Sequence, residues 1–152
     1  RGQKSILPRT FLYLLETGLD DDQKEVLDWL AKTMERAIED IYDPIEGGFF
    51  RYAETRGWRI PHYEKFSDLN AGSVLLLYRL NEIRPFPKLT EAANATLGYL
   101  TSTLFDSDLG CFLNFQVADT NYYFFNKKRR KAVDPPQVIR KVFSDRLAEM
   151  FY

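Results

Sequence analysis

The sequence has few of the side chains that build disulfides and metal sites. Cys111 is the only cysteine and His62 the only histidine among 152 residues. A disulfide within the chain needs two cysteines, and protein zinc sites need several cysteine or histidine ligands. The sequence also contains no glycine-rich phosphate loop and no nucleophile elbow. We therefore expect no disulfide, no bound metal ion and no cofactor.

A net charge is almost absent as well, because 21 Lys and Arg residues balance 22 Asp and Glu residues. Such a chain has no overall field that attracts nucleic acid or an anionic membrane. The basic run Lys127–Lys131 is typical of a solvated loop. No apolar run approaches the roughly 20 residues of a membrane span, and Arg1 to Lys4 lack the apolar stretch of a secretory signal. We expect a soluble, cytoplasmic protein that binds neither nucleic acid nor membrane.

Apolar residues at helical spacing are abundant, in a composition that is 45% hydrophobic. This is enough for one core, and the length is too small for two domains of usual size. Ranges 21–41 and 88–104 repeat apolar residues every three or four positions between charged ones, which predicts amphipathic helices. Range 66–83 contains Val74–Tyr78, apolar on every side, and predicts a helix that is buried nearly all round.

Two further helices complete the expected order. Thr10–Glu16 is a short apolar segment ended by Gly18, and Ser144 is placed to cap a final helix. Acidic residues 20–22 favour the start of the helix at 21–41. Buried and solvent-facing helices thus alternate along the chain. Two concentric layers of antiparallel helix pairs require such alternation, so we predict an all-α fold, a segment of an α/α-hairpin toroid.

A short pattern occurs twice after solvent-facing helices. Residues 43–49 and 106–112 align without gaps at a spacing of 63 residues, and both run from an aspartate through a glycine to a phenylalanine. Aspartate favours the start of a turn and glycine permits a positive φ. We interpret each copy as a turn that leads from a helix into an extended loop.

The segment 47–65 carries most of the polar chemistry. Phe49–Glu54 and Trp58–Tyr63 are aromatic and β-branched runs on either side of Thr55–Gly57, which predicts a β-hairpin. Aromatic, basic and acidic side chains gathered in one loop are typical of the mouth of a ligand site. Here they are Arg51, Trp58, Arg59, His62, Glu64 and Lys65. In the alternative interpretation, Trp58 and Tyr63 only pack the hairpin onto the helices.

A family pattern reads G-G-G-F-H-R-Y followed by W-x-x-P-H-F-E-K-M-x-x-D-N. The chain matches it in register at Gly47, Gly48, Phe49, Arg51, Tyr52, Trp58, Pro61, His62, Glu64, Lys65 and Asn70. On these residues the chain resembles the thioredoxin-domain-containing proteins that include YyaL and the spermatogenesis-associated thioredoxin-like proteins. Weaker similarity extends to Gln116–Asp119 and Tyr122–Tyr123.

The resemblance implies an α/α toroid of six hairpins, similar to that of N-acylglucosamine epimerases. About two and a half hairpins fit here, so residues 1–152 are expected to form part of a single toroid domain, an incomplete ring. Self-association, or a missing toroid or thioredoxin-like portion, would then cover the inner helices. The implied ligand is a polyhydroxylated, carbohydrate-like small molecule.

Three departures from the family pattern remove polar groups. Phe50 stands where the family has histidine, Leu69 where it has aspartate, and Val117 interrupts the polar run Gln116–Asp119. An apolar side chain cannot transfer a proton or hold a sugar hydroxyl. We therefore expect a ligand cleft without efficient catalysis.

Two other functions stay open. In an active sugar epimerase or isomerase, His62 would move a proton next to a carbonyl, with Glu64 or Asp119 as its partner. In a protein-interaction module, Trp58, Tyr63 and Tyr122–Tyr123 would form a docking surface. Arg51, Trp58, His62 and Glu64 are expected to converge. The candidate catalytic residues are His62 and Glu64, and the candidate ligand-binding residues are Arg51, Tyr52, Trp58, Arg59, Lys65, Asn70, Gln116 and Asp119.

Overall fold

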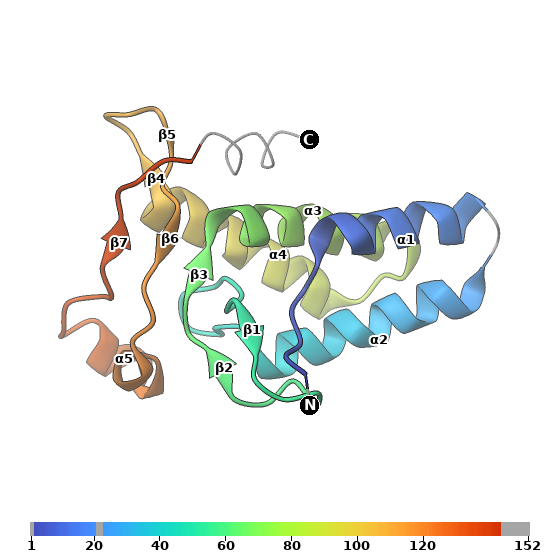
Figure 1. The fold of residues 1–152 in the computed structure, drawn as a ribbon, viewed down its shortest axis with the longest axis horizontal. Coiled ribbons are helices and arrows are strands. Elements are labelled where there is room, and N and C mark those ends of the chain that lie inside the picture. The colour runs from blue at the N-terminus through green and yellow to red at the C-terminus, as the bar shows by residue number, and fades with distance from the viewer. Residues whose placement is uncertain (1, 21–22, 144–152) are drawn as a thin grey trace.

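The computed structural model of the chain describes residues 2–20 and 23–143. Four long helices make up most of it (Figure 1): α1 (Pro8–Asp20), α2 (Lys24–Asp40), α3 (Ser67–Ile83) and α4 (Pro87–Tyr99). A π-helical turn, Leu100–Leu104, continues α4, and two short helices follow, α5 (Thr120–Phe124) and α6 (Lys127–Arg130). The strands are β1 (Tyr52–Ala53), β2 (Pro61–His62), β3 (Lys65–Phe66), β4 (Phe105–Asp106), β5 (Cys111–Phe112), β6 (Phe115–Gln116) and β7 (Val138–Ile139).

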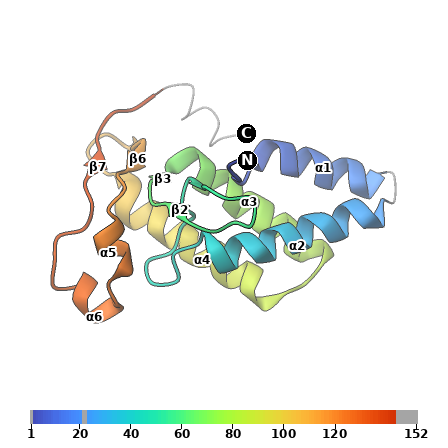
Figure 2. The same ribbon diagram turned by 60° about the horizontal axis from the view of Figure 1, so that its bottom comes forward.

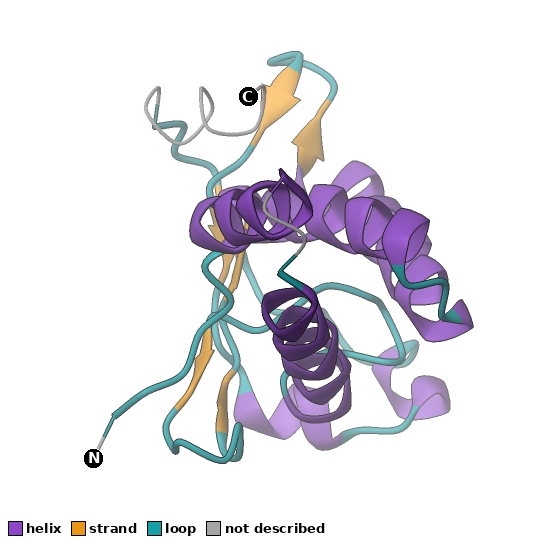
Figure 3. Cartoon of the chain, turned by 90° about the vertical axis from the view of Figure 1, so that its right-hand side faces the viewer, coloured by secondary structure: helices purple, strands orange, loops and turns teal. Residues whose placement is uncertain are grey.

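The prediction of an all-α fold is wrong. The structure is about 53% helical and 12% strand, in three small sheets, and is therefore mixed α and β. Besides the expected pair of β1 and β2, β4 pairs with β5, and β3, β6 and β7 form a three-stranded antiparallel sheet. The strands lie along one side of the helices (Figure 3). Sheets form there because the extended segments between helices carry backbone N–H and C=O groups that need partners.

The helices pack as two antiparallel pairs. Short connections join α1 to α2 and α3 to α4, and α1 also packs against α3 (Figures 1 and 2). The main core lies between the four helices and the segment around Phe49. None of the helices in the described residues combines the length and the apolar character that a membrane crossing requires.

The helix at 66–83 is the least exposed of α2, α3 and α4, as expected, since only Leu75 and Glu82 of α3 are exposed. It is not buried all round, because Leu75, within the run Val74–Tyr78, is 43% exposed. As expected, α2 and α4 each keep a solvent face. The first helix differs from the expectation. It continues past Gly18 to Asp20 and exposes 67% of Tyr13. The helix predicted from Ser144 lies outside the described residues, as do Asp21 and Asp22 of the acidic run. Asp20 ends α1, and α2 begins at Lys24 with Gln23 as its N-cap.

The two copies of the repeated pattern form the same kind of turn. The Asp43 carboxylate accepts a hydrogen bond from the Ile45 N–H at 3.1 Å, and that of Asp106 accepts one from the Asp108 N–H at 3.0 Å. In each copy an antiparallel pairing joins the two sides of the turn, a bridge from Tyr42 to Phe49 in the first copy and β4 with β5 in the second. The repeat therefore connects each helix pair to the strands that follow it.

Candidate functional site

The predicted hairpin exists, with Tyr52 opposite His62 and Ala53 opposite Pro61. Its connection is a turn held by Thr55, whose carbonyl oxygen accepts a hydrogen bond from the Trp58 N–H at 3.2 Å. Trp58 and Ile60 adopt φ values of 64° and 63°. Bulky and β-branched residues rarely adopt the left-handed region, so tertiary contacts hold this turn in place.

Three of the four residues expected to converge do so. A guanidinium nitrogen of Arg51 donates to the Glu64 Oε2 atom at 2.8 Å, and His62 Nε2 lies 3.2 Å from the same oxygen. The His62 ring stacks on Tyr52, with centroids 4.7 Å apart and planes 4° from parallel. The Arg51 N–H also donates to the Glu64 carbonyl oxygen. Register within the hairpin thus brings Arg51, Glu64 and His62 together.

A cleft of about 800 Å³ lies next to this group, between residues 3–9, α3 and β1. Arg51 and Tyr52 line it, whereas His62 and Glu64 do not. Its walls combine apolar and polar side chains, among them Leu7, Leu12, Leu69, Leu75, Ser5 and Asp68. The two candidate acid-base residues therefore lie outside the lining of the cleft, and Glu64 is bonded to Arg51, which does line it.

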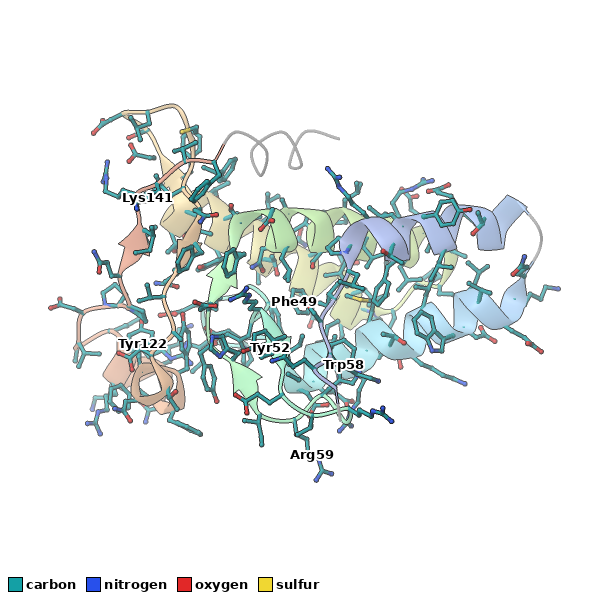
Figure 4. The ribbon with its side chains drawn as sticks, in the orientation of Figure 1. Phe49, Tyr52, Trp58, Arg59, Tyr122 and Lys141 are labelled. Atoms are coloured by element: carbon teal, nitrogen blue, oxygen red, sulfur yellow. The ribbon has the colours of Figure 1, made fainter. Side chains whose placement is uncertain are left out.

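Trp58 and Arg59 lie in a different place from Arg51. The Trp58 ring is 4% exposed, with the Lys4 ammonium 5.2 Å from its centroid. In Figure 4 the Arg59 side chain projects away from the body of the molecule below Trp58. Both residues line a second groove that shares no lining residue with the cleft. The expected single site is thus divided in two, because the left-handed turn at residues 58–60 directs these side chains away from β1.

Lys65 is fully buried and does not line the cleft. Its ammonium donates to Asp43 Oδ2 and to the Gly47 carbonyl oxygen, both at 2.8 Å, and lies 4.5 Å from the Tyr99 ring centroid. Burial lowers the pKa of Lys65, and the carboxylate of Asp43 opposes this effect. The Lys65 ammonium is therefore bonded to groups within the protein. These bonds connect the first repeated turn to β3.

Asn70 and Gln116 are also buried and bonded within the protein. Asn70 Nδ2 donates to the carbonyl oxygens of Phe49 and Phe66, and its Oδ1 accepts from the Phe49 N–H at 2.6 Å. Gln116 Oε1 accepts from the hydroxyls of Tyr99 and Tyr123. Burial raises the pKa of both tyrosines, so these hydroxyls stay protonated and donate. Asn70 and Gln116 thus hold neighbouring segments in position.

Asp119 and the aromatic residues near it have local roles. Asp119 precedes α5 and its Oδ1 accepts from the Tyr122 N–H at 3.0 Å, as an N-cap does. Tyr122, Tyr123 and Trp58 are buried, which leaves them unavailable as an exposed docking surface. Phe50, at the family's histidine position, packs edge-on against Tyr63 and Tyr123.

Sequence reasoning missed the central charges of this region. Asp43 is buried, and Arg130 donates to both of its carboxylate oxygens, at 2.9 and 2.7 Å. Arg130 also donates to the Tyr123 carbonyl oxygen. In the basic run expected to be a solvated loop, Arg130 is buried while its neighbours are exposed. The short helix α6 gives each residue a different direction, and no pattern in five consecutive cations reveals which one points inward.

No known protein family and no curated protein matches the chain. Among residues 2–20 and 23–143, no group of three or more His, Cys, Asp and Glu side chains is placed to hold a metal ion.

Proposed function

We propose that this chain binds a small polyhydroxylated molecule in the cleft lined by Arg51 and Tyr52, without efficient catalysis. The observation that carries the proposal is the cleft itself, whose volume of about 800 Å³ is that of a small-molecule site. The resemblance to the YyaL-like proteins supports it, because Arg51 and Tyr52 are matched positions. A cytoplasmic location is part of the same proposal and is consistent with the single cysteine.

The lining suits a ligand with one apolar and one polar face. Leu7, Leu69 and Leu75 offer apolar surface on which the C–H face of a sugar ring can pack. Arg51, half exposed and held by Glu64, offers charged N–H donors for hydroxyl groups. This combination of an apolar wall with a few oriented polar groups is typical of small-molecule sites.

The position of His62 and Glu64 supports a role without catalysis. A general base must lie within hydrogen-bond reach of the proton that it takes. Neither side chain lines the cleft, and the Glu64 carboxylate is already bonded to Arg51. A ligand in the cleft would meet Arg51 before it met either acid-base group.

One observation favours the epimerase alternative. His62 Nε2 and Glu64 Oε2 lie 3.2 Å apart, and about one third of the His62 side chain is exposed. A different approach of a sugar, over the stacked Tyr52 and His62 rings, would bring it to this pair. Deuterium exchange at the carbon beside the carbonyl, abolished by His62→Ala, would establish that alternative.

The test is a titration with N-acylhexosamines and simple aldoses in deuterated buffer, followed by amide chemical shifts. We expect shifts at residues 3–9, at 51–52 and in α3, with no enzyme-dependent exchange. Arg51→Met should weaken binding about tenfold, because a hydrogen bond to a charged group contributes roughly 1.5–3 kcal/mol. The matched control, Arg59→Met, removes the same group outside the cleft and should leave affinity unchanged. Equal weakening by both variants, or no shifts at millimolar ligand, would contradict the proposal.

A further inference from the structure

A second groove, of about 680 Å³, lies between α2 and the turn at residues 55–59. Its lining includes five basic side chains, from Lys4, Lys32, Arg36, Arg56 and Arg59, and contains no Asp or Glu. The groove is thus positively charged although the chain as a whole carries a formal net charge of −1. A local concentration of one charge in a concave surface attracts ligands of the opposite charge.

Three of these cations are available to a ligand. Arg36 pairs with Glu39 on its own helix, at 3.0 Å. Lys32, Arg56 and Arg59, in contrast, form no ion pair with any residue in the described ranges, and all three are exposed. The acidic residue next to the turn, Glu54, does not line the groove.

An aromatic face accompanies these charges. Trp29 of α2 is 50% exposed, and its ring packs edge-on against Phe11, with centroids 5.6 Å apart. Trp58, buried beneath Lys4, forms another part of the lining. The edge-on contact fixes the Trp29 ring while leaving surface on which a planar group can stack.

The turn that carries Arg56 and Arg59 is held in one conformation. The Arg59 N–H donates to Thr55 Oγ1 at 3.1 Å, and the Thr55 hydroxyl in turn donates to the Arg59 carbonyl oxygen at 3.1 Å. The left-handed φ of Trp58 places its ring inward while Arg59 points outward, as Figure 4 shows. A guanidinium on an ordered turn loses less conformational entropy when it binds an anion.

We propose that this groove binds a small phosphorylated aromatic compound, a nucleoside di- or triphosphate in chemical class. The base stacks on Trp29, and the phosphates lie against Lys32, Arg56 and Arg59. Several unpaired cations call for a ligand with more than one negative charge, and an exposed indole calls for a planar ring. A nucleic-acid polymer fits less well, because a chain with a formal net charge of −1 has no overall field that attracts one.

The two tryptophans of the chain, Trp29 and Trp58, both line this groove. Tryptophan emission therefore reports on the groove, while the cleft beside Arg51 has no tryptophan in its lining. The experiment titrates the whole chain with adenosine diphosphate, adenosine and inorganic pyrophosphate, and follows emission together with calorimetry. We expect the diphosphate to change the emission and to bind at least tenfold more tightly than either fragment.

Substitutions test the assignment of the groups. Arg59→Met and Lys32→Met, both at exposed positions, should each weaken the binding of adenosine diphosphate about tenfold. Trp29→Leu should make adenosine diphosphate bind no more tightly than pyrophosphate. Arg51→Met is the matched control and should leave affinity unchanged. The proposal would be overturned if pyrophosphate bound as tightly as adenosine diphosphate, or if Lys32→Met and Arg59→Met left the affinity unchanged. It would also be overturned if a single-stranded oligonucleotide bound more tightly, or if nothing bound at all.

Discussion

Asp43 is a buried carboxylate that binds two buried cations. Lys65 and Arg130, which lie 22 and 87 residues away in sequence, both donate to its carboxylate. Burial alone would raise the pKa of Asp43, but the two cations and their hydrogen bonds outweigh burial and lower it. Asp43 therefore stays ionised, and its charge balances cations that would otherwise be buried without a partner.

We predict that Asp43→Asn lowers the free energy of unfolding by about 3–5 kcal/mol at neutral pH. Removing one member of a buried ion pair leaves the others uncompensated, and this is what makes the loss large. The matched control is Asp106→Asn at the equivalent position of the second turn. Its partner, Arg140, has a side chain that is 68% exposed, so the loss should be about 1 kcal/mol or less. Urea unfolding of both variants measures the difference, and equal losses would contradict this account.

The turns after α2 and α4 share one sequence pattern but differ in how closely they pack against the rest of the protein. Gly47 and Gly110 occupy the same position of the repeat and have φ values of 80° and 63°. A Cβ atom at Gly47 would overlap the backbone carbonyl oxygen of Ala95 in α4, whereas one at Gly110 would have nothing within 4 Å. The first turn is therefore pressed against a helix and the second is open.

Alanine at these two glycines separates backbone conformation from packing. Gly110→Ala should cost about 1–2 kcal/mol, the ordinary cost of a left-handed conformation for a residue with a Cβ atom. Gly47→Ala has the same conformational cost, and moving the turn away from α4 adds about 1–3 kcal/mol. Thermal unfolding of the two variants gives the comparison. A Gly110→Ala variant as unstable as Gly47→Ala would show that the close approach to Ala95 has no energetic weight.

At the scale of the whole molecule, long-range contacts join the last described segment to the helices. The strand β6 pairs with β3 through Lys65 and Gln116, and Arg130 reaches Asp43. Figure 2 shows α5, α6 and β7 at the end of the molecule opposite the last residues of α1 and the first residues of α2. The Asp43 contacts are thus part of the global fold, and their loss should affect unfolding of the whole chain.

Acid should therefore weaken the global fold in a way that depends on Asp43. The folded-state pKa of Asp43 lies below its ordinary value of about 3.9, so its contribution is fully present above that value and is lost as pH falls through the folded pKa. Between about pH 5 and pH 2 the midpoint of thermal unfolding of the wild type should approach that of Asp43→Asn. A difference between the two midpoints that stays constant over this range would exclude the charge of Asp43 as its source.

Local patterns allowed the helices and the hairpin to be predicted. The ranges 66–83 and 21–41 lie within a few residues of α3 and α2, because the spacing of apolar side chains depends only on residues three and four apart. The meeting of Arg51, His62 and Glu64 followed from hairpin register in the same way. Trp58 lies apart from these three residues because its backbone adopts a left-handed conformation. A glycine at that position would have indicated such a conformation, but a tryptophan does not.

The sequence by itself determined where α2, α3 and α4 form and that α3 is the least exposed of these three helices. The tertiary structure alone decided the three-stranded sheet, because the two-residue strand Lys65–Phe66 pairs with Phe115–Gln116, about fifty residues away. It also decided that Lys65, Asn70 and Arg130 face inward and that Arg51 and Arg59 belong to separate surfaces. The physical reason is that burial of a charged or polar group depends on distant partners such as Asp43, and nothing in the local sequence specifies those partners.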